Sequence, residues 1–333
     1  MSSSVSIKEI AELAGVSIAT VSRVVNQKGG YSAATEERVR SIIQKTCYAQ
    51  GAIARGAQNE KKAVIGLMVP DILNEHFTEM TLEIQKALSR KGYLTMICNW
   101  DESLELEKKY LEMMIQQQVS GLILVSGADG NLDTKGIPTV YVDRRPEEEV
   151  SDGHVFVESD NPYGGYLATR ELIRQGCKKI VFLTDMQQES SKITRYQGYC
   201  RALTEAGLEL NPSLILQVER IDIDVAREVI TDALKRGLMF DGIMCTTDIL
   251  AVASEVAVEK YGLRVPEDIK ITGYDDTPIT SLLRIPITSV NQNRSRLAEK
   301  ATDLLSAMIE GKEIENGRYV VPVNLVERKS TGK

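Results

Sequence analysis

The sequence predicts an α/β protein in which a small all-α, helix-turn-helix head precedes a two-lobed, doubly wound α/β body. In the N-terminal part, apolar residues recur at helical spacing. From Ala63 onward, short apolar runs alternate with amphipathic helices in two successive sets, one for each lobe. We therefore expect a head at 1–48, a linker at 49–62 and a body at 63–333, with a first lobe at about 63–159 plus 291–325 and a second at about 160–290.

The head begins with two short helices separated by a tight turn. The capping box Ser6–Glu9 starts the first helix, and Gly15 ends it in the position of a left-handed cap. Ser17 caps a second helix, Ile18–Val25, and a third follows Ser32. Because the first two helices are only a few residues apart, the pattern is typical of a helix-turn-helix.

The outer face of the second helix carries residue types that read DNA. Arg23 can donate two hydrogen bonds to a guanine, and Ile18 and Ala19 offer apolar contact, as to a thymine methyl group. Nearby hydroxyl and amide groups suit phosphates. A plain three-helix cap remains the alternative. The DNA-contacting residues that we expect in this segment are Ser17, Ile18, Ala19, Thr20, Ser22, Arg23 and Asn26.

Charge divides the chain in a similar way. Residues 1–62 hold nine Lys and Arg against five Asp and Glu, a net charge of +4. The total net charge is −7, so the rest of the chain carries −11. A basic head on an acidic body suits local contact with phosphates. An excess this small can also arise by chance, so the charge agrees with DNA binding without deciding it.

Composition and motifs argue against several other classes of protein. The five cysteines are scattered and only two histidines occur, which excludes a His-rich zinc site. No G-x-G-x-x-G or Walker A string follows an expected strand, so we expect neither a cofactor nor a metal. There is no apolar run of about 18 residues, and acidic residues interrupt the apolar stretch near the start. We therefore expect a cytoplasmic protein.

Literal strings in the head resemble those of a known family. The string Ile10–Gly15, IAELAG, is followed by Val16–Asn26, VSIATVSRVVN. Together they closely resemble the N-terminal signature of the LacI/GalR repressor family. The resemblance implies that Ile18 and Ala19 hold the family's most operator-selective positions and that Arg23 is its shared base-contacting arginine.

Residues 48–57, YAQGAIARGA, occupy the place of the family's hinge helix. Such a helix folds on the operator and inserts a leucine into the minor groove. Ala54 and Arg55 match it, so the resemblance implies that they contact DNA. Gly51, Gly56 and Ala57 depart from the family pattern. Each glycine costs a short helix about 1 kcal/mol, and an alanine methyl group is a poor wedge, so the hinge helix should form less readily here. A flexible linker with one basic side chain is the alternative.

The body carries family strings as well, among them Val142-Asp-Arg144, Arg195-x-x-Gly198 and Gly273-Tyr-Asp-Asp276. The resemblance implies a periplasmic-binding-protein-like effector domain. Its two lobes would be joined by three crossovers, near Asp160, near Gln292 and near the tail. In doubly wound folds, ligands bind where the carboxyl ends of strands face a cleft.

The cleft residues implied by the resemblance suit a small sugar or sugar phosphate as effector. Carboxylates and arginines can hold hydroxyl groups, and an aromatic ring can cover C–H faces. Each could instead be part of the scaffold; Asp275 and Asp276, for example, can cap a turn. The expected effector-binding residues are Asp71, Phe77, Arg144, Asp160, Arg195, Thr247, Asp275 and Gln292.

Together these observations predict a transcriptional repressor of a carbohydrate-utilisation operon, with operator affinity controlled by the effector. We expect a homodimer, because two heads suit a palindromic operator and no leucine heptad follows Thr331. A secreted sugar-binding protein and a glycoside hydrolase are the alternatives. The hydrolase would need a carboxylate pair drawn from Asp160, Asp275 and Asp276.

Overall fold

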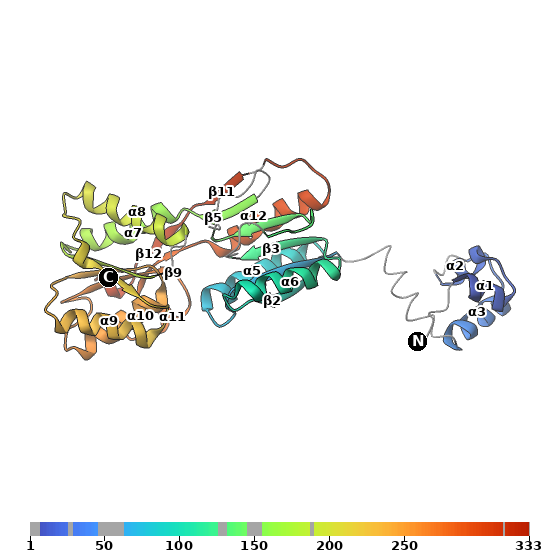
Figure 1. The fold of residues 1–333 in the computed structure, drawn as a ribbon, viewed down its shortest axis with the longest axis horizontal. Helices are drawn as coiled ribbons and strands as arrows, with labels where there is room; N and C mark the ends of the chain where they lie inside the picture. The colour runs from blue at the N-terminus through green and yellow to red at the C-terminus, as the bar shows by residue number, and fades with distance from the viewer. Residues whose placement is uncertain are drawn as a thin grey trace. The chain divides into compact units, whose positions relative to one another are not determined.

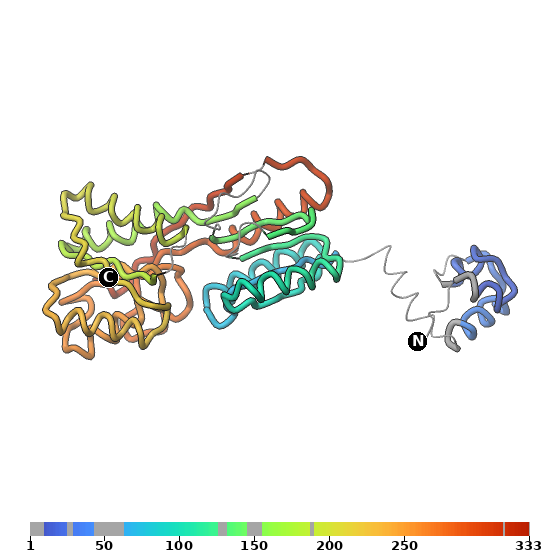
Figure 2. The backbone as a smooth tube through the Cα atoms, in the orientation of Figure 1, coloured from blue at the N-terminus to red at the C-terminus, as the bar shows by residue number. Residues whose placement is uncertain are grey.

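The computed structural model describes residues 7–25, 29–45, 63–125, 132–144, 155–186, 190–315 and 317–332. The chain divides into two compact units, Met1–Lys62 and Ala63–Lys333, which we call the head and the body (Figures 1 and 2). The expected cap at Ser6, the expected linker 49–62, and the DNA contacts expected at Asn26, Ala54 and Arg55 lie outside the described residues.

The head consists of helices α1 (Ile7–Ala14), α2 (Ile18–Val25) and α3 (Ala33–Lys45), in the order that the sequence predicts. Gly15, with a φ of +64°, ends α1 and lets the chain turn at once. The Ser17 hydroxyl caps α2 by accepting a hydrogen bond from the Thr20 N–H at 3.1 Å. The buried core of the head is formed by Ile10, Ala11, Ala14, Val21, Val24 and Val39.

The first lobe of the body is built on a six-stranded sheet in the order β11-β5-β4-β3-β1-β2, and its pairings are parallel. Helices α5 (Glu75–Arg90) and α12 (Arg294–Ile309) pack on one face, and α6 (Leu104–Gln116) packs on the other. The strands are β1 (Val64–Val69), β2 (Leu94–Asn99), β3 (Gly121–Val125), β4 (Thr139–Val142), β5 (Val155–Ser159) and β11 (Gly317–Val321).

The second lobe is built on a sheet in the order β12-β10-β9-β8-β6-β7, in which β12 runs antiparallel to β10. Helices α7 (Asn161–Arg174) and α8 (Ser190–Glu205) pack on one face, and α9 (Ile223–Lys235) and α10 (Asp248–Lys260) on the other. The strands are β6 (Ile180–Asp185), β7 (Ile215–Val218), β8 (Gly242–Cys245), β9 (Lys270–Asp275), β10 (Thr288–Asn291) and β12 (Asn324–Val326), with short helices at Pro212–Leu214, Ile279–Leu282 and Lys329–Thr331.

The chain crosses between the lobes three times, after β5 at Asp160, after β10 at Gln292 and after β11 at Pro322. The expected first-lobe segment 291–325 therefore ends too late, because β12 pairs with β10 in the second sheet. Since β9 occupies only one side of β10, the other side is an open edge that the returning chain fills.

Two glycines allow α7 and α8 to pack backbone against backbone. A Cβ atom added to Gly165 would lie 2.1 Å from the backbone oxygen of Arg195, and one added to Gly198 would lie 2.0 Å from the backbone oxygen of Pro162. Even a methyl group would therefore have to move one of the helices. This contact fixes the position of α8, and with it the position of Arg195.

We predict that Gly165→Ala destabilises the body, although the same change at an open helix position stabilises by about 1 kcal/mol. The added methyl group meets backbone that cannot change rotamer, so the cost should reach about 3 kcal/mol, the upper end for overpacking. Urea unfolding measures it. Thr204→Ala, at an exposed position of α8, is the control and should change the free energy of unfolding by less than about 1 kcal/mol. Equal stability of both variants would show that α7 and α8 separate freely.

Candidate functional site

A cleft lies between the two lobes of the body, where the carboxyl ends of β4 and β9 meet. Both lobes contribute to it, as does one of the crossovers. Such strand ends are the usual ligand sites of doubly wound folds. The lining residues are Asn74, His76, Phe77, Asp143 and Arg144 from the first lobe, Ser191, Lys192, Arg195, Ile221, Thr247 and Asp275 from the second, and Gln292 from the crossover.

Two aspartates enter this cleft from strand ends in different lobes. Asp143 directly follows β4, and Asp275 is the last residue of β9. Their φ angles are +78° and +111°, a region that costs a non-glycine residue about 1–3 kcal/mol. The two residues are only 3% and 6% exposed. Strained backbone and buried charge at one place are typical of a binding site.

The imidazole of His76 lies between these two carboxylates. Its Nε2 atom is 3.6 Å from Asp143 Oδ1, and its Nδ1 atom is 3.7 Å from Asp275 Oδ1. Asn74 caps α5 and accepts a hydrogen bond from the His76 N–H at 3.1 Å, which holds this residue at the start of the helix. His76 is 4% exposed, and neither ring nitrogen has a hydrogen-bond partner among the described residues. The imidazole of His76 therefore lies where each of its two nitrogen atoms faces a carboxylate from a different lobe.

Arg195 is a buried cation of the second lobe with a fixed orientation. Its Nε donates to Asn161 Oδ1 at 2.8 Å, and its Nη1 donates to the backbone oxygen of Thr246 at 2.7 Å. The guanidinium carbon lies 3.6 Å from the centre of the Tyr274 ring, which adds a cation–π contact. Because a guanidinium has five N–H groups, further donors remain for a ligand in the cleft.

Other cleft side chains surround the two aspartates. Gln292 Nε2 donates to Asp275 Oδ1 at 2.6 Å, so a crossover residue holds this carboxylate. Arg144 Nε lies 3.7 Å from Asp143 Oδ2, and its guanidinium carbon lies 5.1 Å from the centre of the Phe77 ring. The cleft thus presents donors, acceptors and an aromatic ring within one small volume.

The surroundings of Asp143 keep it ionised. Burial alone would raise the pKa of Asp143, but contact with the imidazole of His76 and the charges of Arg144 and Arg195 hold that pKa well below its usual range. The opposite holds behind the cleft, where burial and repulsion from Asp275 raise the pKa of Asp248 well above its usual range. The pKa values of Asp143 and Asp248 therefore shift in opposite directions because their neighbours differ.

Two of the expected effector-binding residues do not line the cleft. Asp71 Oδ1 accepts a hydrogen bond from the Leu73 N–H at 2.8 Å in a turn, and Asp160 Oδ1 accepts one from the Tyr163 N–H at 3.1 Å and caps α7. An aspartate that follows a strand can serve a turn or a helix start as well as a ligand. Thr247 lines the cleft and also caps α10. The expected residues that do line the cleft are Phe77, Arg144, Arg195, Thr247, Asp275 and Gln292.

The structure adds cleft residues that sequence reasoning missed, chiefly His76, Asp143 and Lys192. Lys192 Nζ is 2.5 Å from Asp185 Oδ2, and both side chains are buried. Lys192 stands three residues before Arg195, which places the two on one face of α8, and this spacing was the available signal. For Asp143 the available signal was its place in the string Val142-Asp-Arg144, directly after β4. The contact of His76 with both lobes has no local signal, because only the packing of the lobes produces it.

The outer face of α2 in the head is accessible. Ile18 is 48% exposed, and Ala19 and Arg23 are exposed as well. The hydroxyl groups of Ser17 and Thr20 lie 2.9 Å apart at the start of the helix, so both take part in its capping. Ile18, Ala19 and Arg23 are therefore the side chains of this face with no capping role, and Ser22 beside them is partly exposed.

Comparison with known proteins gives a family match in the head and another in the body. Residues 6–50 match the bacterial regulatory proteins of the lacI family, and residues 169–331 match a periplasmic binding protein-like domain. The ribose operon repressor of Halalkalibacterium halodurans is 33% identical over 327 residues, which cover 98% of this chain and 96% of that protein. The chain belongs to the LacI family of transcriptional regulators.

Further LacI-family proteins align over most of the chain. The transcriptional repressor PurR of Pasteurella multocida is 32% identical over 330 residues, which cover 97% of this chain and 98% of that protein. A solved regulator of the family from Alkaliphilus metalliredigens, complexed with D-xylulofuranose, is 30% identical with a TM-score of 0.73, and the match covers 81% of this chain and 99% of that one. The family resemblance and the fold class expected from the sequence are thereby confirmed.

The relatives named above are regulators, so the hydrolase alternative gains no support from them. Two of its three carboxylates also serve the scaffold. Asp276 Oδ2 accepts a hydrogen bond from Asn291 Nδ2 at 2.7 Å, and Arg328 donates to its Oδ1 at 2.5 Å, while Asp160 caps α7. Across the described ranges, no helix of this LacI-family chain has both the length and the apolar character to cross a membrane.

We predict that Asp143→Asn lowers the free energy of unfolding at pH 7 by about 1–3 kcal/mol. Folding lowers the pKa of Asp143 below its ordinary value of 3.8, so its ionised form contributes stability above about pH 4. That contribution is lost as the pH falls through the folded-state pKa, and the difference between parent and variant should shrink towards pH 3.

Urea unfolding between pH 7 and pH 3 measures this difference. Asp303→Asn is the control, because the Asp303 side chain is 65% exposed and pairs with Lys91 at the surface. Its effect should stay below about 1 kcal/mol at every pH. A loss for Asp143→Asn that does not change with pH would contradict the prediction.

Proposed function

We propose that this LacI-family chain represses a carbohydrate-utilisation operon, and that a small sugar or sugar phosphate in the interlobe cleft sets its affinity for operator DNA. The observation that supports this most directly is that side chains from both lobes line the cleft. Asp143 comes from the first lobe, and Asp275 and Arg195 come from the second. A ligand held by both lobes favours one arrangement of them over others, which is what an effector must do.

The cleft chemistry suits a molecule rich in hydroxyl groups. Asp143 and Asp275 accept hydrogen bonds from hydroxyls, and Arg195 donates to hydroxyl or phosphate oxygens. Phe77 offers a ring for the C–H face of a sugar. One relative is named for the ribose operon and another was solved with D-xylulofuranose, so five-carbon sugars are the first ligands to test.

In the head, the proposed DNA reader is the outer face of α2. Arg23 would contact a base, with Ile18 and Ala19 selecting among neighbouring base pairs. A homodimer would present two such helices to a palindromic operator. The proposal includes phosphate or minor-groove contacts from Asn26, Ala54 and Arg55, and it places the protein in the cytoplasm, where operator DNA is found.

A thermal-shift screen of the full chain with pentoses, hexoses and their phosphates tests the cleft. A ligand at 100 times its Kd adds about 2.7 kcal/mol to stability, which is readily measured. We predict that Arg195→Lys abolishes the shift, because lysine cannot reproduce the fixed guanidinium contacts. Arg201→Lys, whose parent side chain is 62% exposed on the same helix, should retain it.

Fluorescence anisotropy on operator DNA then links the cleft to DNA binding. The sugar that raises the melting temperature should change operator affinity, and Arg195→Lys should bind the operator normally without responding to that sugar. Equal shifts for Arg195→Lys and Arg201→Lys would place the ligand outside this cleft.

In the head, we predict that Arg23→Ala weakens operator binding by about 1–3 kcal/mol and relaxes the preference at one base position. The reason is the loss of a bidentate contact, which phosphate contacts cannot replace. Selection from a randomised operator pool measures the preference. Arg38→Ala removes another exposed arginine of the head, from α3, and should leave base preference intact. An unchanged preference for Arg23→Ala would contradict the proposed contact.

A further inference from the structure

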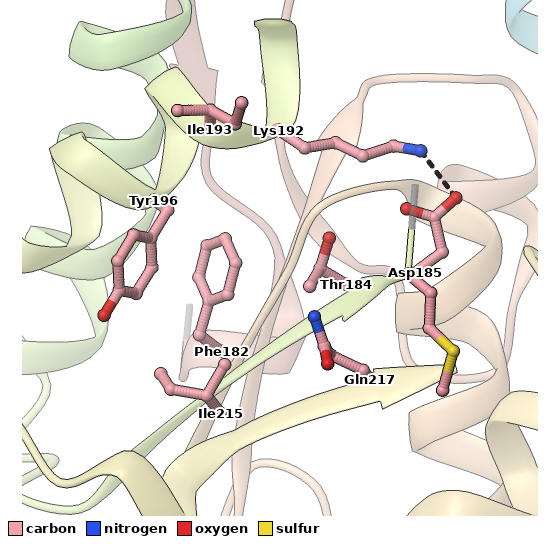
Figure 3. Close-up of a pocket in the computed structure, with 9 residues that line it drawn as sticks. Phe182, Thr184, Asp185, Lys192, Ile193, Tyr196, Ile215 and Gln217 are labelled. Carbon is pink, nitrogen blue, oxygen red and sulfur yellow. Dashed lines mark hydrogen bonds and ion pairs between the residues drawn. The ribbon is translucent and has the colours of Figure 1, made fainter. Parts of the chain in front are cut away.

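A second cavity, of about 220 Å³, lies within the second lobe between the start of α8 and the carboxyl ends of β6 and β7 (Figure 3). We call it the side pocket. Its floor consists of Phe182 and Thr184 from β6 and Ile215 and Gln217 from β7. It is closed on the α8 side by Lys192, Ile193 and Tyr196, and at the end of β6 by Asp185 and Met186.

The side pocket follows from the alternation of side chains along β6 and β7. Phe182 and Thr184 are two residues apart and share one face of the sheet, as do Ile215 and Gln217 on the neighbouring strand. Ile193 and Tyr196 of α8, three residues apart, face them. The carboxyl ends of parallel strands are where doubly wound folds bind ligands, and this pocket uses two strand ends other than those of the interlobe cleft.

Charge is balanced among the described residues that line the side pocket. Among the described residues that line it, the charged ones are Asp185 and Lys192, whose Oδ2 and Nζ atoms are 2.5 Å apart, and both side chains are buried (Figure 3). A ligand with a net charge would therefore have to leave water without gaining an opposite charge, which is costly. The lining favours a neutral ligand.

The remaining lining favours a flat ring. The rings of Phe182 and Tyr196 meet edge to face, with centroids 5.2 Å apart and planes at 66°. Met186, Ile193 and Tyr196 keep 59%, 45% and 38% of their surface exposed, so burying them against a ring would be favourable. An apolar cavity of about 150 Å³ is enough for benzene, so the side pocket has room for one substituted ring.

One exposed polar side chain, that of Gln217, borders this apolar lining. The Gln217 side chain is exposed at the pocket and makes no hydrogen bond to any other described residue. Its amide can donate to, or accept from, a hydroxyl group on the ring. A phenol combines these properties, since it is flat, neutral, the size of one ring and carries one hydroxyl.

We propose that the side pocket is an accessory binding site for a small neutral aromatic compound of the phenol class, distinct from the interlobe cleft. One residue, Lys192, lines both cavities. A ring in the side pocket packs against the alkyl stem of Lys192, whose position also shapes the cleft. The site goes beyond the sugar effector, and its main test, titration with phenol, uses neither a free sugar nor DNA.

Isothermal titration of the full chain with phenol tests the site. We expect saturable binding of one phenol per chain. Ile193→Lys places an ammonium group at the mouth of the pocket and should weaken phenol binding about tenfold or more. Leu210→Lys is the matched control, because Leu210 is also 45% exposed in the second lobe but lies outside the pocket, and it should bind phenol as the parent does.

Two further compounds test whether the side pocket prefers a neutral ring and whether it binds a ring that is not joined to a sugar. Benzoate has the same ring with a negative charge and should bind about tenfold more weakly than phenol or worse. Phenyl β-D-glucoside joins the ring to a sugar; binding of this compound without binding of free phenol would make the pocket an extension of the cleft and overturn the proposal. Equal phenol affinity of Ile193→Lys and Leu210→Lys would overturn it as well.

Discussion

The body depends on the positive charges and hydrogen-bond donors that stabilise two buried carboxylates, those of Asp143 and Asp275. A carboxylate removed from water is stable only beside positive charge or hydrogen-bond donors. Here those groups come from three places, with His76 and Arg144 on the first lobe, Arg195 on the second and Gln292 on a crossover. The charge balance of the cleft therefore changes whenever the lobes move, and a ligand that supplies donors of its own changes which arrangement is stable.

Helix α8 connects this balance to the rest of the second lobe. Gly198 brings its backbone against α7, Arg195 and Lys192 face the cleft, and Ile193 and Tyr196 face the side pocket. Because α8 packs backbone against backbone with α7, the residues on one of its sides cannot shift without moving those on the other. A ligand in either cavity therefore acts on the same rigid helix. Coupling between two sites requires such an element, whose position both ligands can influence.

Local signals in the sequence account for the parts of the fold that were predicted. Helix α1 ends and helix α2 begins where expected because Gly15 and the Ser17 cap lie next to each other in the chain. The polar strand β10 and the edge strand β12 depend on partners distant in sequence, so no local pattern separates them from loop. The same limit applies to the cleft. Arg195 and Asp275 stand in family strings, whereas the place of His76 between two carboxylates, and the capping role of Asp160, follow from tertiary packing and strand-end geometry.

The three crossovers determine the order in which the protein can mature on the ribosome. The first lobe lacks α12 and β11 until residues 294–321 have been made, and the second lobe lacks β12 until Val326. The hydroxyl of Ser330, which accepts a hydrogen bond from the Thr288 N–H and donates one to the backbone oxygen of Ile271, emerges later still. The head is continuous in sequence and can fold as soon as it is exposed. During synthesis, a nascent chain therefore carries a finished head while its body is still incomplete, and DNA contact by such chains would escape control by any ligand.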